Sequence, residues 1–323
     1  MTTVAVVIPT LRRPEPLARC LAALAAQTHL PDELVVVTST GDASTEAAVA
    51  SSPTPVTLVR CDEPGVLAAM AAGAAATSAE LVVFTDDAAE APPAWLEQLV
   101  AALERSTLVG AAGGRDVVEH PDGTLEDAPR TSDVGRLTWY GRHDGGHHLG
   151  SAPSRDVAFL KGVNAAYRRH ALGIPHGLRG EGAQVHFEVA MGRFARRRGY
   201  RLVYDPAIEV AHRPAPRQGE DQRGAPSPRA VSDAAYNLVV AIGGVRGACR
   251  VGYATVLGDR GSPGLGYALA VSLRGERGAV RRARSAIAGT LAGGWALARG
   301  RGLTYSTVPA ARVAGDATST SAS

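Results

Sequence analysis

The sequence predicts an α/β protein with a mostly parallel central sheet flanked by helices, and with a helical appendage after it. Two observations predict this class. Short continuous apolar runs, such as residues 4–9 and 81–84, suit strands that are buried on both faces of a sheet. Helical periodicities alternate with these runs through the first half of the chain, which is typical of parallel strands joined by right-handed crossovers.

Each expected element of the first half has its own local signal. Leu17, Leu21 and Leu24 recur at helical spacing, and Pro92 and Pro93 mark the start of a later helix. In order, we expect strand 4–9, helix 14–26, strand 34–37, a short helix after a loop and cap, strand 56–59, helix 66–76, strand 81–84 and a helix through residue 103.

The second half is less regular. Residues 113–158 show little periodicity, and a segment of this length without elements is usually functional or mobile. His147 and His148 within it are either exposed to solvent or part of a site. Residues 159–169 predict a turn before a helix. Within residues 180–206, Glu188, Met191 and Ala195 can share one face of a helix that ends at Gly199. A strand follows at residues 201–204, and residues 208–211 lead to His212.

Composition excludes several classes of function. The 323 residues carry a net charge of +3, and the chain lacks the strongly basic stripe of a nucleic-acid-binding protein, so we expect no nucleic-acid partner. Three widely spaced cysteines form no metal-ligand pattern and suit a reducing cytoplasm. The absence of G-x-G-x-x-G after the first strand and of a P-loop motif argues against dinucleotide oxidoreductases and P-loop enzymes.

The most informative stretch is LVVFTDDA, residues 81–88, in which Asp86 and Asp87 follow a buried strand. Ligands of open α/β sheets bind beyond the carboxyl ends of the strands. Two adjacent carboxylates there need a compensating cation, and a divalent metal that holds a phosphate supplies one. The alternative is a solvated turn that caps the next helix.

Four segments together resemble the family 2 glycosyltransferases of GT-A fold, and most of all an actinobacterial branch. They are VVIPTLRRPEPLARCLAAL, PGVLAAMAAG followed by VVFTDDA, FLKGVNAAYRR, and HFEVAMGRFARRRGYRLVYDPAIEVAH, and the resemblance covers residues 4–223. It implies transfer of a sugar, with inversion, from a nucleotide diphosphate sugar to an acceptor hydroxyl. It also implies Mn²⁺ or Mg²⁺ at the diphosphate.

The resemblance assigns roles residue by residue. Glu188 stands eleven residues before Gly199, where the family has its catalytic Asp, and would be the base. The nucleotide sugar would be bound by Pro9, Thr10, Arg12, Asp42 and Asp86, and the metal by Asp87 and His212. The acceptor or donor pocket would contain Trp139, Lys161, Gly162, Asn164 and His186.

Three departures from the family pattern surround one pocket. Ala88 replaces an acid that often touches the metal, Thr38 and Ser39 stand where an acid contacts the base, and Ala71 replaces a frequent Asn. The alternative to an enzyme is therefore a weakened, metal-independent or inactive GT-A protein that binds a sugar nucleotide or a partner.

The last third is expected to differ from the rest. Residues 213–229 form a Pro- and Arg-rich hinge, residues 234–257 and 265–273 suit amphipathic helices, and residues 281–301 are apolar with flanking arginines. Such segments either lie on an anionic membrane surface or pack on the enzyme. We expect a glycosyltransferase domain over residues 1–223, a helical appendage over 224–307 with peripheral membrane contact, and a disordered tail over 308–323. The protein would act at the cytoplasmic face, on a glycan or lipid-linked acceptor of the cell envelope.

Overall fold

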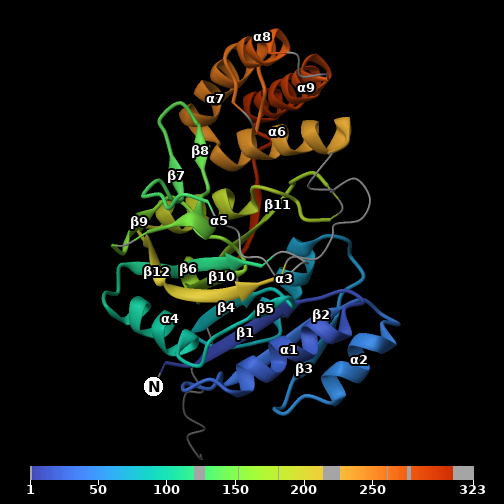
Figure 1. Ribbon diagram of the computed structural model, residues 1–323, viewed down its shortest axis with the longest axis vertical. Helices are drawn as coiled ribbons and strands as arrows, with labels where there is room; N and C mark the ends of the chain where they lie inside the picture. The colour runs from blue at the N-terminus through green and yellow to red at the C-terminus, as the bar shows by residue number, and fades with distance from the viewer. Residues whose placement is uncertain are drawn as a thin grey trace, which may run out of the picture.

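The computed structural model describes residues 2–119, 128–151, 153–180, 182–213, 226–259, 261–274 and 278–307. Within these ranges the main sheet has nine strands in the order β3-β2-β1-β4-β10-β6-β12-β5, with β9 paired to β12 (Figure 1). The predicted first half is present as β1 (Val4–Pro9), α1 (Pro14–Ala25), β2 (Glu33–Thr38), α2 (Ala43–Ala50), β3 (Thr57–Arg60), α3 (Val66–Ala75), β4 (Leu81–Thr85) and α4 (Trp95–Glu104). A short strand that was not predicted, β5 (Ala89–Glu90), lies between β4 and α4.

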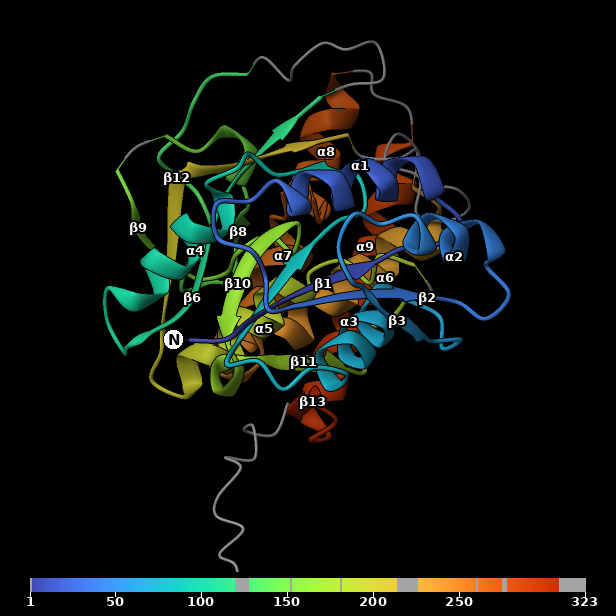
Figure 2. The same ribbon diagram turned by 90° about the horizontal axis from the view of Figure 1, so that it is seen from below.

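Helices cover both faces of this sheet, as an α/β fold requires. Successive residues of β1 alternate between the two faces: Val6 packs with α1 and α4, whereas Val7 packs with α3 and with α5 (Phe187–Arg197). Figure 2 shows α1 and α3 on opposite sides of β1. The continuous apolar run of β1 therefore reflects burial on both faces.

The prediction of a helix after Lys161 is wrong, because that segment forms the central strand β10 (Asn164–Arg168). It runs antiparallel between β4 and β6 (Val109–Val118). Ala165 and Tyr167 face one core and Ala166 the other, so tertiary pairing overrides the local helical preference of alanine. Gly113 allows the close approach, since a Cβ there would lie 2.4 Å from the carbonyl oxygen of Asn164.

The segment 113–158 was expected to lack elements, but its described residues form several. It contains the end of β6, a hairpin of β7 (Arg136–Leu137) and β8 (His143–Asp144), the 3-10 turn η1 (His147–Leu149) and β9 (Arg155–Val157). β7 and β8 pair with each other, whereas β6 and β9 pair with strands distant in sequence, and no local periodicity reports such contacts. The strand expected at residues 201–204 continues through residues 208–211 as β12 (Arg201–His212), with an irregular register between Asp205 and Glu209.

The C-terminal part forms α6 (Pro228–Ile242), α7 (Gly244–Val256), α8 (Leu265–Leu273) and α9 (Ala279–Ala298). Gly243, at φ 55°, separates α6 from α7, which the sequence joined in one segment. Leu238 and Ile242 of α6 pack on Val189 of α5. The chain then forms a strand that was not predicted, β13 (Thr304–Thr307), which pairs with β11 (Gly173–His176) after the turn η2 (Arg169–Ala171).

Two predictions on this part fall outside the described residues. They are the disordered tail, 308–323, and most of the hinge, 213–229. Among the residues that the structure describes, no helix combines the length and the apolar character needed to cross a bilayer.

Candidate active site

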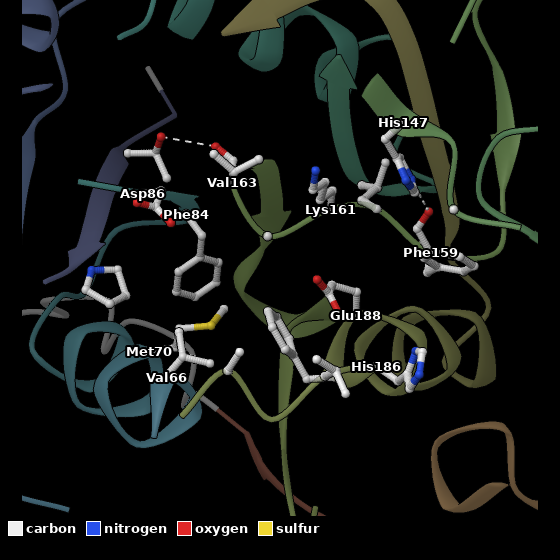
Figure 3. A pocket seen from close by; sticks show the side chains of 18 of the residues that line it. Val66, Met70, Phe84, Asp86, His147, Phe159, Lys161, Val163, His186 and Glu188 are labelled. Carbon is white, nitrogen blue, oxygen red and sulfur yellow. Dashed lines mark hydrogen bonds between the residues drawn. The ribbon is translucent and has the colours of Figure 1, made fainter. Parts of the chain in front are cut away.

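A cavity of about 740 Å³ opens at the carboxyl ends of β1 and β4. Figure 3 shows Asp86 on one side of it, Glu188 and His186 from the start of α5 on the other, and Lys161 above Glu188 in this view. The predicted residues that line it are Pro9, Asp86, Lys161, Gly162, His186, Glu188 and His212. The predicted residues outside the lining are Thr10, Arg12, Asp42, Asp87, Trp139 and Asn164.

The two adjacent carboxylates face different surroundings. The side chain of Asp86 is 41% exposed and lines the cavity, whereas that of Asp87 is 2% exposed. Asp87 accepts hydrogen bonds from Thr10 Oγ1 at 2.6 Å and from Arg13 Nη1 at 2.5 Å. Burial and the neighbouring Asp86 raise the pKa of Asp87. Asp87 therefore holds the loop after β1 in place, and Asp86 faces the ligand space.

Arg13 is a cavity residue that the sequence analysis missed, because it selected Arg12. Arg12 is exposed with its backbone at φ 53°, and it does not line the cavity. The Arg13 guanidinium lines it, 2.5 Å from Asp87 and 3.6 Å from Asp86. Only the path of the loop decides which of two adjacent arginines points inward.

Asp42, expected at the nucleotide, is 3% exposed and holds a loop. Its Oδ2 accepts from the Arg12 backbone N–H at 2.7 Å, and its Oδ1 accepts from the Thr45 backbone N–H at 3.1 Å as the cap of α2. The hydroxyls of Thr38, Ser44 and Thr45 also donate to it. Burial acts to raise the pKa of Asp42, but these bonds outweigh burial and lower it.

Lys161 lies on the floor of the cavity, beside a buried acid that the sequence analysis did not select. Its ammonium donates to Asp116 Oδ2, on β6, and the Asp116 side chain is 0% exposed. His212 Nδ1 lies 3.5 Å from the same oxygen. Burial acts to raise the pKa of Asp116, but His212 and Lys161 lower it to about 2. Asp116 is therefore a carboxylate that positions one cation of the cavity.

Glu188 lies in the first turn of α5, half-buried, where a negative side chain complements the helix dipole. His186, two residues before Glu188, has φ 73° and occupies the N-cap position of the helix. The backbone of this turn therefore places both side chains at the cavity, as Figure 3 shows.

Three imidazoles form the wall near α5. The His143 and His186 rings meet edge to face at 4.6 Å, and His147 Nε2 lies 3.1 Å from the carbonyl oxygen of Phe159. Burial lowers the pKa of His143, lowers that of His147 to about 4, and lowers that of His186 well below its ordinary value. These histidines are neutral at pH 7, and His147 is buried rather than solvated.

Trp139 and Asn164 were both expected in the pocket and lie elsewhere. Trp139 is 71% exposed beside Tyr140 in the loop between β7 and β8. Asn164 is fully buried; it accepts from Trp95 Nε1 at 2.9 Å and donates to two backbone carbonyls. Asn164 therefore ties α4 to the central strands.

Sequence comparison identifies the family. The model of the family described as "Glycosyltransferase like family 2" matches residues 2–223, more than half of the chain. The protein belongs to glycosyltransferase-like family 2. This confirms the predicted class of enzyme, and no curated protein matches the chain in sequence.

Solved structures support the GT-A fold. The glycosyltransferase-like chain is similar to GalNAc-T7, crystallised with UDP, GalNAc and Mn²⁺, at a TM-score of 0.55 and 16% identity over 75% of this chain and 48% of that one. It thus spans about half the length of that protein. Two further structures are similar at lower TM-scores. Mannosyltransferase PcManGT from Pyrobaculum calidifontis, with GDP-Man and Mn²⁺, gives 0.49 and 17% identity over 91% and 86% of the two chains. Glucosyl-3-phosphoglycerate synthase from Mycobacterium tuberculosis, with Mn²⁺, UDP and phosphoglyceric acid, gives 0.47 and 20% over 73% and 78%.

The cavity of this family 2 protein does not fit a divalent cation well. Among the described residues, no group of three His, Cys, Asp or Glu side chains is placed to hold a metal. Asp87 already has Thr10 and Arg13 as donors, and Ala88 is apolar and buried. Asp86 remains, but a cation on Asp86 Oδ1 would share that oxygen with a guanidinium 3.6 Å away.

Proposed function

We propose that this protein transfers a sugar from a nucleotide diphosphate sugar to an acceptor hydroxyl with inversion, as a member of an actinobacterial branch that builds cell-envelope polysaccharide or glycoconjugate. One observation carries the proposal. Asp86, at the end of β4, and Glu188, at the start of α5, line a single cavity although 102 positions separate them. A donor at the strand ends and an acceptor at the helix would meet between these two carboxylates.

The proposed reaction is one displacement at the anomeric carbon. The acceptor oxygen forms a bond to that carbon while the bond to the diphosphate oxygen breaks, and its electron pair leaves with the nucleoside diphosphate. Glu188 takes the proton of the acceptor hydroxyl. Attack from the face opposite the leaving group inverts the configuration. Glu188, across the cavity from Asp86, is suitably placed for attack from that side (Figure 3).

The wall made by His143, His186 and Phe159 is the proposed acceptor side. Neutral imidazoles can donate to and accept from hydroxyl groups, and an aromatic ring can pack on the apolar face of a sugar. The His143 Nδ1 atom is buried and has no hydrogen-bond partner among the described residues, so an acceptor hydroxyl would satisfy it. These properties suit a glycan or the sugar end of a lipid-linked acceptor.

The test is Glu188→Gln, which keeps size and removes the basic oxygen. Diphosphate release from a panel of nucleotide sugars with candidate acceptors is expected to fall by about 10²- to 10⁴-fold, the usual contribution of a general base. Donor affinity, measured by calorimetry, is expected to stay within about threefold. Glu97→Gln is the matched control, because Glu97 also lies in a first helical turn but is exposed on α4. Transfer by Glu188→Gln at the wild-type rate would remove Glu188 from the reaction.

The second candidate is a protein that binds a sugar nucleotide without turnover. Ala88 favours it, because this position often carries the metal-contacting acid in the family that the sequence resembles. Donor binding by the wild-type protein, with no transfer to any acceptor of the panel, would favour this candidate.

We also propose that the protein acts at the cytoplasmic face of the membrane, in peripheral contact through α8. Leu265, Leu269 and Leu273 recur every four residues there and are 62%, 64% and 81% exposed. The helix LGYALAVSL has no charged residue, and a helix apolar on all sides is normally covered. Exposed Arg274 follows α8 directly, and exposed Arg281 lies in the first turn of α9, which suits the headgroups of an anionic bilayer. Figure 1 places α8 at the end of the molecule farthest from β1 to β3.

A further inference from the structure

We propose that Lys161 and Arg13 bind the diphosphate of the donor directly, so that donor binding needs no divalent cation. The inference rests on the proposed function, since it assumes a nucleotide diphosphate ligand. It concerns how this chain supplies the positive charge that the departing diphosphate requires.

Lys161 has the geometry of a ligand-binding cation. An ammonium has three donors, and the buried Asp116 carboxylate takes one of them. The side chain is 34% exposed and lines the cavity, so the remaining donors face the ligand space. Figure 3 shows Lys161 and Glu188 near each other, both across the cavity from Asp86, so the scissile bond of a donor bound beside Asp86 would face both side chains.

Asp116 fixes this cation more firmly than a surface acid would. It is fully buried, its Oδ1 has no hydrogen-bond partner among the described residues, and its Oδ2 is shared by Lys161 and His212. A buried carboxylate depends strongly on its partners, because desolvation is not otherwise compensated. Lys161 is therefore held in one position before any ligand arrives.

Arg13 supplies the second cation, from the loop after β1. Asp87 fixes its Nη1, and the guanidinium lines the cavity with its side chain 26% exposed. A guanidinium binds phosphate oxygens through paired donors. The cavity lining contains two carboxylates, Asp86 and Glu188, and the two fixed cations Arg13 and Lys161. These cations would compensate the negative charge of a bound diphosphate.

A divalent metal would need more ligands than the described lining of the cavity offers. A divalent metal would have to use Asp86 beside Arg13, with Ala88 where another acid is expected. Direct binding of the diphosphate by Lys161 and Arg13 requires no further ligand. The competing explanation is that Lys161 only neutralises the buried Asp116 and never touches a ligand.

The first experiment is calorimetric titration of the full chain with UDP and with GDP, in EDTA and in MnCl₂. For whichever of the two nucleotides binds more tightly, we expect the affinity in EDTA to be within about threefold of the affinity in MnCl₂. An affinity that falls more than about thirtyfold in EDTA overturns the inference and leaves the proposed function standing. If neither nucleotide binds in either buffer, the proposed function fails as well.

The second experiment separates ligand contact from structural neutralisation. Lys161→Met is expected to weaken binding of the nucleoside diphosphate by about 10- to 100-fold, the loss of a charge-assisted hydrogen bond. Binding of the matching nucleoside, which has no phosphate, is expected to be unchanged. Lys161→Arg keeps the charge and is expected to retain most of the affinity.

The double variant Lys161→Met/Asp116→Asn decides between the two explanations. It removes the lysine without leaving Asp116 as an unpaired buried charge. If Lys161 contacts the diphosphate, binding stays weak in the double variant. If the lysine only neutralises Asp116, the double variant recovers wild-type affinity, and equal loss of nucleoside and nucleotide binding in Lys161→Met points the same way. Recovery of affinity in the double variant, or equal loss of nucleoside and nucleotide binding in Lys161→Met, overturns the inference.

Discussion

The substitution Asp42→Asn tests whether this acid contacts the nucleotide or holds the loop after β1. The carboxylate has two oxygens, and each accepts from one backbone N–H, of Arg12 and of Thr45. The amide of asparagine keeps one oxygen, so one of these N–H groups loses its acceptor. The surrounding hydroxyls can rotate to accept from the new NH₂ group, whereas a backbone N–H cannot.

The magnitude follows from this arrangement. A buried backbone donor without an acceptor costs about 1–3 kcal/mol, and the remaining bonds lose about 1 kcal/mol as the acceptor becomes neutral. Thr45 is fully buried, so solvent does not replace the lost acceptor of its N–H group. We expect Asp42→Asn to lower the free energy of unfolding by about 2–4 kcal/mol. Because the Asp42 pKa is lowered in the fold, the difference is expected to be constant from pH 5 to pH 8 and to shrink only in stronger acid.

Thermal unfolding with a fluorescent dye measures the effect, and a calorimetric titration with UDP or GDP on the same preparations measures binding. Asp62→Asn is the matched control, because Asp62 also accepts from a backbone N–H and a hydroxyl, of Thr40, but is exposed. We expect a much smaller shift for it. An Asp42→Asn protein that melts like the wild type but no longer binds nucleotide would refute the loop-holding role and restore the prediction made from sequence.

Three further perturbations test other parts of the structure. Burial lowers the pKa of His147 to about 4, so the folded protein binds fewer protons than the unfolded chain between about pH 4 and 6.5, and stability is lost as pH falls through that range. Between pH 8 and 5.5 the wild type is expected to lose stability in urea unfolding, and His147→Gln is expected to lose about 1–1.5 kcal/mol less. The exposed control His170→Gln is expected to lose as much as the wild type, and equal pH dependence in wild type and His147→Gln would contradict this prediction. Asn164→Ala leaves the buried Trp95 indole N–H without an acceptor and is expected to cost about 2–5 kcal/mol in thermal unfolding, while nucleotide affinity of the folded protein is retained; a stable variant that has lost binding would argue for a pocket role instead. Leu269→Asp is expected to reduce co-sedimentation with phosphatidylglycerol vesicles at least fivefold, and Leu108→Asp, an exposed leucine outside the helical appendage, to leave it unchanged; the same sedimentation for both variants would remove α8 from the contact.

The strands and helices of the first half were predictable because their signals are local. Residues 4–9 and 81–84 are apolar without interruption, and the leucines of α1 repeat at the helical period. The placement of acids beyond a strand end, and of Glu188 on a helix that ends at Gly199, could be predicted for the same reason. Around Lys161 the prediction was half right. The turn that carries Lys161 was expected, but the next segment is the strand β10 and not a helix, because it pairs with β4 and β6.

The sequence by itself determined which stretches are buried, where strands and helices alternate, and which motif joins the chain to its family. Tertiary structure alone decided which of two neighbouring side chains faces the cavity: Asp86 rather than Asp87, and Arg13 rather than Arg12. It also decided that Lys161 meets Asp116, 45 positions away, and that β13 returns to β11. The physical reason is that periodicity records how each segment sits against a core, whereas the direction of a loop side chain and the partner of a buried charge depend on groups that folding brings together.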